Sequence, residues 1–136
     1  MKRLWRLSRS PRRYVRVAAV VALVSLAACD GGPKGPGVIN ASIVSPHNLG
    51  AVVVEVEGIG IEGFVGLGGT QAYGAEVSAT TGRHRVVLVS AAGASIQFGI
   101  RVQDLGSDPP IASAVFAAGV DNLPKLLTGI LVTVEN

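Results

Sequence analysis

Residues 94–102 read ASIQFGIRV and decide the fold, because apolar and polar side chains alternate along the whole stretch. In an extended chain, successive side chains point to opposite sides. One side then carries Ile96, Phe98, Ile100 and Val102, and the other carries Ser95, Gln97, Gly99 and Arg101. This period of two is typical of a strand with one buried face. We therefore expect a β-strand here with its apolar side turned into a core.

Short runs rich in β-forming residues recur along the rest of the domain, and Gly, Pro, Asn and Asp residues typical of turns separate them. Residues 51–57 (AVVVEVE) place three valines on one face, and residues 84–91 (HRVVLVSA) form a second strong strand candidate. Further strands are expected over 38–45, 62–69, 75–81, 111–118 and 130–135. Residues 119–128 are expected to form a crossing loop with one helical turn near Pro124.

This rhythm predicts an all-β fold, because no stretch after Val38 shows a convincing helical period. Seven to eight short strands with short connections favour an antiparallel β-sandwich or barrel over alternating βαβ units. Roughly 100 residues is an ordinary size for a β-sandwich, and we expect that architecture over 38–136. The single cysteine excludes an internal disulfide, so the domain must be held together by its core.

The first 28 residues differ in composition from the rest of the chain. Residues 1–16 are basic and polar, and residues 17–28 (VAAVVALVSLAA) are apolar except for Ser25. Crossing a bilayer as a helix takes about 20 apolar residues. A run of 12 is too short for that but suits the apolar region of a signal peptide. We expect residues 1–28 to be such a signal, and residues 29–37, rich in Gly and Pro, to be a tether.

The end of the apolar run, Leu26-Ala27-Ala28-Cys29, resembles the lipobox of bacterial lipoproteins. The resemblance implies cleavage between Ala28 and Cys29, a diacylglyceryl thioether on Cys29, and acylation of its new amino terminus. Two or three acyl chains anchor a protein stably, whereas one alone binds marginally. The expected location is the bacterial cell membrane or outer membrane, with the domain facing the periplasm or the exterior. The alternatives are a plain secretory signal with a chance cysteine and a short membrane helix.

The net charge depends on this cleavage. The full chain has a formal charge of +3 and a pI near 9.5, but seven of its 12 basic residues precede Cys29 and no acidic residue does. The remainder keeps five basic and nine acidic residues, a formal −4. An acidic domain gains nothing from phosphate electrostatics, so we expect no nucleic-acid partner.

Few residues in the domain suggest chemistry. Glu55 and Glu57 share one strand face, and Asp104 and Asp108 share one loop, so these carboxylates are candidate ligands for a calcium ion. A solvated strand face and ordinary turn capping are the simpler interpretations. The two histidines lie far apart and no Cys follows Cys29, which argues against a zinc site. No serine lies in a G-x-S-x-G elbow. We expect no cofactor, no metal and no enzymatic activity.

The ordered stretches GAVVVEVEGIGI (50–61), RVVLV (85–89), IQFGIRVQD (96–104) and GILVTV (129–134) resemble a small immunoglobulin-like or cohesin-like domain found in exported bacterial lipoproteins. The resemblance implies no chemical signature, since that domain has no assigned function. We expect a structural or protein-binding role in the cell envelope, with another envelope protein as partner. The alternatives are a ligand- or calcium-binding module and a hydrolase with a clustered Ser/His/Asp set.

Overall fold

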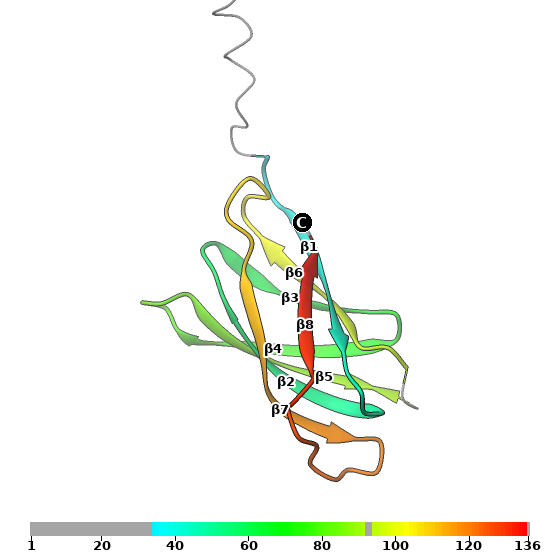
Figure 1. Ribbon diagram of the computed structural model, residues 1–136. Coiled ribbons are helices and arrows are strands. Elements are labelled where there is room, and N and C mark those ends of the chain that lie inside the picture. Colours follow the sequence, from blue (N-terminus) through cyan, green and yellow to red (C-terminus); the bar gives the residue numbers. More distant parts are fainter. Residues whose placement is uncertain (1–33, 92–93, 136) are drawn as a thin grey trace, which may run out of the picture. The chain divides into compact units, whose positions relative to one another are not determined.

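The computed structural model (Figure 1) describes residues 34–91 and 94–135, which belong to one compact unit with two antiparallel four-stranded sheets. Sheet A has the strand order β3-β6-β1-β8 and sheet B the order β4-β5-β2-β7. The strands of sheet A are β3 (Ile61–Leu67), β6 (Gln97–Val102), β1 (Gly37–Val44) and β8 (Leu131–Glu135). Those of sheet B are β4 (Thr70–Ser78), β5 (Arg83–Ser90), β2 (Leu49–Glu57) and β7 (Ile111–Gly119). The expected all-β sandwich of seven to eight strands is confirmed.

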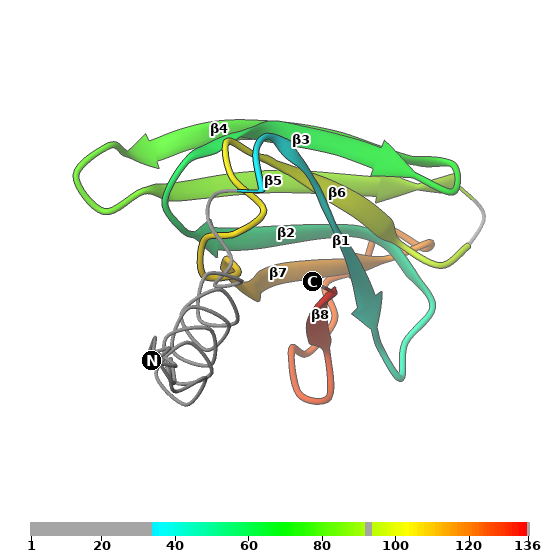
Figure 2. The same ribbon diagram turned by 90° about the horizontal axis from the view of Figure 1, so that it is seen from above.

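The core lies between the two sheets, whose strands overlap in Figure 2 because one sheet lies in front of the other in that view. The expected inward side of residues 94–102 is confirmed, since all four of its apolar side chains are buried. From sheet B, the alternate valines of β2 and Val86 and Leu88 of β5 are fully buried. Partners across strands share a face: Val54 lies opposite Val86, and Val52 opposite Leu88. The period of two in each strand therefore builds the core directly.

The alternation predicts that Gly99 is exposed on the outward side of the strand. In the structure Gly99 is buried. A Cβ placed on Gly99 would lie 2.5 Å from Val38 Cγ1 and 2.9 Å from Val65 Cγ1. The side chains of the two flanking strands thus close over the glycine, and its exposure follows from its neighbours.

Two further expectations are corrected by the structure. The strand expected at 75–81 is β4, which begins five residues earlier at Thr70. Its side chains alternate poorly because β4 is an edge strand with mostly exposed side chains, so its place is set by pairing with β5. No helical turn forms near Pro124. Instead Pro124 makes an isolated antiparallel bridge with Ala118 of β7.

The hairpin from β3 to β4 passes from one sheet to the other. The two strands come so close at Gly66 that a Cβ there would collide with the Thr70 carbonyl oxygen. Gly68 and Gly69 make the turn with φ of 58° and 86°, values that L-residues with a side chain rarely adopt. The strand expected over 62–69 is therefore confirmed as β3, with Phe64 packed against the core, and only Gly68 and Gly69 make the crossing between the sheets.

The connections gather at two ends of the sandwich. At the entry end, where the described chain begins, the Leu105 amide donates to the Gly35 carbonyl at 2.9 Å and the Gly58 amide to the Gly82 carbonyl at 3.2 Å. The far end is formed where β1 ends, with Val44 opposite Leu131. Because β2 runs from the far end to the entry end, Glu57 lies near the point where the chain enters.

Candidate functional site

The outward side of sheet B carries an apolar row that crosses all four strands. Tyr73 of β4 lies opposite Val87 of β5, Val87 opposite Val53 of β2, and Val53 opposite Phe116 of β7. Tyr73 is 61% exposed and Phe116 is 50% exposed, so both aromatic side chains stand at the edges of the sheet in contact with water. We call these four residues the apolar row. The row is continuous across the sheet, with Tyr73, Val87 and Phe116 exposed and Val53 half-buried.

A second line of small and apolar residues runs beside the apolar row, toward the far end. Val89 lies opposite Ala51, which lies opposite Ala118, and Ala118 bridges to Pro124 in the β7–β8 loop. Gln71 of β4 begins this line, and its side-chain oxygen accepts a hydrogen bond from the Tyr73 hydroxyl at 2.8 Å. The loop therefore extends the apolar outward face past the last strand.

Toward the entry end, the next two lines of the same face carry its charges. Arg85 lies opposite Glu55, with Nε 3.2 Å from Oε2, and Arg83 lies opposite Glu57, with Nε 2.6 Å from Oε1. Arg83 Nε is also 3.5 Å from Glu55 Oε1. The hydrogen bond to Glu57, followed by the charges of Glu57 and Glu55, raises the pKa of the Arg83 guanidinium above its ordinary value. The four charged side chains balance one another within the face.

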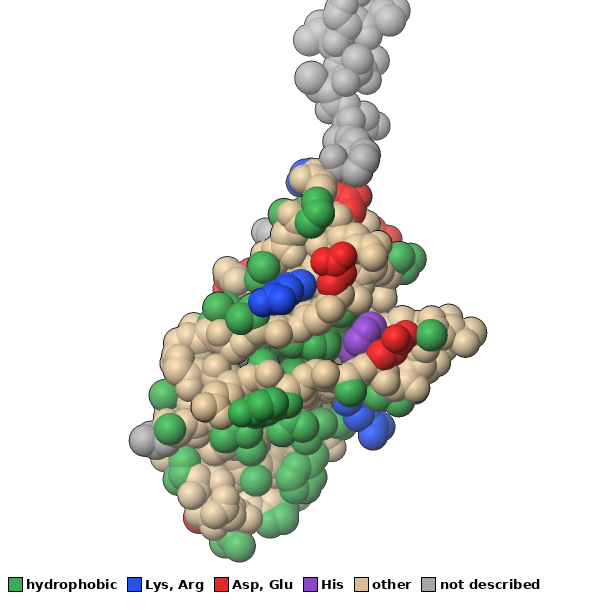
Figure 3. All heavy atoms as spheres, turned by 180° about the vertical axis from the view of Figure 1, so that it is seen from behind, with side chains coloured by type: hydrophobic (Ala, Val, Ile, Leu, Met, Phe, Trp, Pro, Cys, Tyr) green, Lys and Arg blue, Asp and Glu red, His purple; other side chains and the backbone are tan. Residues whose placement is uncertain are grey.

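We call this whole outward side, the apolar row with its apolar and charged neighbours, the outer face of sheet B. Figure 3, which views the domain from behind, shows hydrophobic side chains mostly in its lower half and charged side chains mostly above them. Exposed contiguous apolar surface of this kind is typical of interaction sites.

A further group of exposed apolar side chains lies in the β7–β8 loop at the far end. Leu123 and Leu126 of the loop, and Leu131 at the start of β8, are all more than half exposed. The loop is held against the free side of β7 by backbone hydrogen bonds from Lys125 to Ala117 and from Gly119 to Leu123, both 2.9 Å. The loop therefore covers the last residues of that edge strand and leaves its leucines in solvent.

The sequence analysis proposed Glu55, Glu57, Asp104 and Asp108 as ion ligands. The structure shows that both glutamates are already engaged by arginines of β5. Glu57 and Asp108 line one hollow of about 260 Å³ at the entry end, together with Ile59 and Ile111. Within residues 34–91 and 94–135, no three His, Cys, Asp or Glu side chains come together in a group able to hold a metal ion.

Asp104 holds the chain where it enters the domain. Its Oδ1 accepts three backbone N–H groups, from Gly106 at 2.8 Å, Lys34 at 2.7 Å and Gly35 at 3.1 Å. These hydrogen bonds, that of Gly106 first, lower the pKa of the Asp104 carboxyl below its ordinary value. Asp104 therefore caps its own turn, as the simpler interpretation expected, and also holds Lys34 and Gly35, which lie in the predicted tether.

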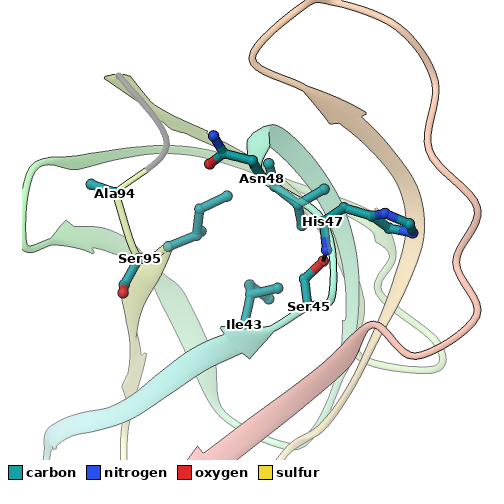
Figure 4. Close-up of a pocket in the computed structure, with 8 residues that line it drawn as sticks. Ile43, Ser45, His47, Asn48, Ala94 and Ser95 are labelled. Atoms are coloured by element: carbon teal, nitrogen blue, oxygen red, sulfur yellow. Dashed lines mark hydrogen bonds between the residues drawn. The ribbon is translucent and has the colours of Figure 1, made fainter.

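The two histidines lie at opposite ends of the domain. His84 packs edge-on against Phe64, with ring centroids 5.9 Å apart, and its Nδ1 lies 3.2 Å from the Gly82 carbonyl oxygen. His47 borders a cavity of about 190 Å³ at the far end, with Ser45, Asn48 and Ser95 among the other lining residues. Figure 4 shows the His47 ring turned away from this cavity. The histidines therefore do not combine into one site.

The predicted cleavage and lipidation site, Ala28 and Cys29, lies outside the described residues, as does the whole predicted signal peptide. Among the residues that the structure describes, no helix is long and apolar enough to cross a membrane. Comparison of the chain with protein-family models, with curated proteins and with solved structures found no match.

Sequence reasoning missed the outer face of sheet B. Phe116 lies in the expected strand 111–118, and Tyr73 lies in a stretch for which no strand was expected. One signal could have predicted a strand at Tyr73: residues 70–75 follow the glycine turn at Gly68 and Gly69 and place Gln71, Tyr73 and Ala75 on one side of an extended chain. The alignment of Tyr73 with Val87 and Val53 depends on the strand order, which no local pattern encodes.

Proposed function

We propose that this protein is a lipid-anchored lipoprotein of the bacterial cell envelope with a non-enzymatic, structural or protein-binding role. The acyl chains on Cys29 hold it to the cell membrane or the outer membrane, and the domain faces the periplasm or the exterior. The support for anchoring is the order of a basic start, a 12-residue apolar run and Leu26-Ala27-Ala28-Cys29. The domain is a small sandwich of the immunoglobulin-like or cohesin-like kind.

The observation that carries the binding role is the exposed apolar row. Burying the two aromatic and two valine side chains against a partner removes their apolar surface from water, at about 25 cal/mol per Å². Aromatic residues are enriched at protein interfaces because their large rings supply contact area. Exposed aromatic side chains in line with two valines do not make a domain more soluble, so solubility alone does not account for Tyr73 and Phe116 in this row.

Anchoring is tested by metabolic labelling with radioactive palmitate in a bacterial host. We expect label in the wild-type protein and in Ser25→Ala, which leaves all four lipobox positions intact, and no label in Cys29→Ser. Unlabelled wild-type protein, or equal label in Cys29→Ser, would contradict the anchor. The binding role is tested by crosslinking in intact cells followed by mass spectrometry. Absence of any crosslinked protein, another copy of this chain included, would count against it.

A further inference from the structure

The outer face of sheet B carries the same order of apolar side chains, an aromatic residue and then a valine, whether it is followed from the β4 edge or from the β7 edge. Going inward from one edge, β4 offers an aromatic ring and β5 a valine with arginines nearer the entry end. Going inward from the other edge, β7 offers an aromatic ring and β2 a valine with glutamates nearer the entry end. The two halves therefore carry the same kinds of apolar side chain on one line and opposite charges on the lines nearer the entry end. A surface with this property is complementary to a copy of itself, as a twofold interface requires.

We propose that the outer face of sheet B binds the same face of a second copy of this chain. The twofold axis runs along the strands, midway between β5 and β2. Rotation about this axis places β5 of one copy opposite β2 of its partner, and β4 opposite β7. The resulting pairs between copies are Tyr73 with Phe116, Val87 with Val53, Arg85 with Glu55, and Arg83 with Glu57.

The charges favour a second copy over other occupants. The mature chain has a formal charge of −4, so two copies repel over most of their surface. On this face, two arginines and two glutamates cancel, and the rotation brings each arginine line over a glutamate line. Like charges therefore do not face each other across the interface, and the repulsion that such pairs would cause is avoided. A neutral face offers no attraction to an anionic lipid surface.

The size of the face fits a weak, reversible dimer. Four strands about 4.8 Å apart and four lines about 6.7 Å apart give a flat footprint of roughly 500 Å² per copy. Two copies then bury roughly 1,000 Å², about the lower bound for a specific interface. Confinement to a membrane raises the local concentration of the second copy, so a modest affinity suffices there.

The axis direction also suits two anchored chains, and this point rests on the proposed function. A twofold axis along the strands leaves both copies running the same way, so both entry ends lie at one end of the dimer. Residues 29–33 can span at most about 18 Å. With a tether this short, two anchored domains must both direct their entry ends toward the membrane. An axis across the strands would send the two entry ends in opposite directions.

The test is thiol crosslinking of the full chain in membranes with a short bismaleimide. Tyr73→Cys and Phe116→Cys are expressed separately and together as a double variant. Within one copy these positions lie three strand spacings apart, about 14 Å, so the short linker cannot join them. Between copies, position 73 of one chain faces position 116 of the other. The two copies of position 73 lie about 17 Å apart, because three strand spacings separate them sideways and the two sheets stack about 10 Å apart. We expect a covalent dimer from the double variant and only monomer from either single variant and from the wild type.

Monomer from the double variant would overturn the proposal. So would equal dimer from the single variants, which would indicate random collision or an axis across the strands, and so would a crosslink from Tyr73→Cys to another protein. If the double variant fails to fold, Gln71→Cys with Ala118→Cys repeats the test on the next line of the face. The crosslink does not depend on acylation, because a parallel Cys29→Ser chain can be assayed at high concentration. Loss of palmitate label with a retained crosslink therefore refutes the anchor alone.

Discussion

Replacing Leu88 with alanine tests whether the sandwich core has the arrangement described here. Leu88 is fully buried, and its cross-strand partners Val52 and Ala72 also face the core. These neighbours are held in their strands by backbone hydrogen bonds, so they can collapse only partly into the space that Leu88 leaves. Leu→Ala changes at such sites cost about 2.7–5 kcal/mol, which combines lost transfer energy with the cavity. The total stability of a domain of roughly 100 residues is about 5–15 kcal/mol, so this loss is about a fifth of it or more.

The assay is thermal and urea unfolding of the purified protein, followed by circular dichroism. At about 4–8 °C for each kcal/mol, the Tm of Leu88→Ala should fall by roughly 11–40 °C. Leu126→Ala is the matched control, because the same atoms are removed from a side chain that is 77% exposed. Its free energy of unfolding should stay within about 0.5 kcal/mol of wild type. A loss below about 1 kcal/mol for Leu88→Ala, or equal losses for both variants, would refute the assignment of the core.

Two further predictions concern the carboxylates. The pKa of Asp104 is lowered in the folded state, so its charge stabilises the fold above the ordinary Asp pKa of about 3.9, and this contribution is lost as pH falls through the folded value. Asp104→Asn should therefore lower the Tm at pH 6, with a difference from wild type that shrinks below about pH 4; a difference independent of pH would contradict this. For the calcium-binding alternative, the arginine partners of Glu55 and Glu57 lead us to expect no heat in calorimetry and no rise in Tm with millimolar calcium. A saturable heat that disappears in Glu57→Gln would show that this expectation is wrong.

Much of the core could be predicted from the sequence because strand periodicity is local. The order of side chains in 51–57 and 94–102 already decides which residues turn inward, whatever the strand pairs with. The same reasoning failed for Gly99 and for β4. In both cases neighbouring strands, and not the residue itself, decide the outcome: valines cover Gly99, and β5 supplies the pairing that holds Thr70–Ser78 in a strand.

The resemblance of Leu26-Ala27-Ala28-Cys29 to a lipobox is also read from the sequence alone, because the cleavage and acylation that it implies would act on a linear stretch. The predicted modification of Cys29 therefore does not depend on how the domain folds. The candidate binding face is the opposite case. Backbone hydrogen bonds between strands do not depend on which side chains the strands carry, so strand order is set by the packing of the whole domain.

By itself, the amino-acid sequence determined the all-β class and the inward residues of the strongest strands, and it predicts an anchor at Cys29. Only the tertiary structure decided that β4, β5, β2 and β7 lie side by side. This order joins Tyr73 and Phe116 through two valines, and places Arg83 and Arg85 against Glu57 and Glu55. The reason is physical: alternation along a strand is a property of neighbours in the chain, whereas a surface is made by neighbours in space.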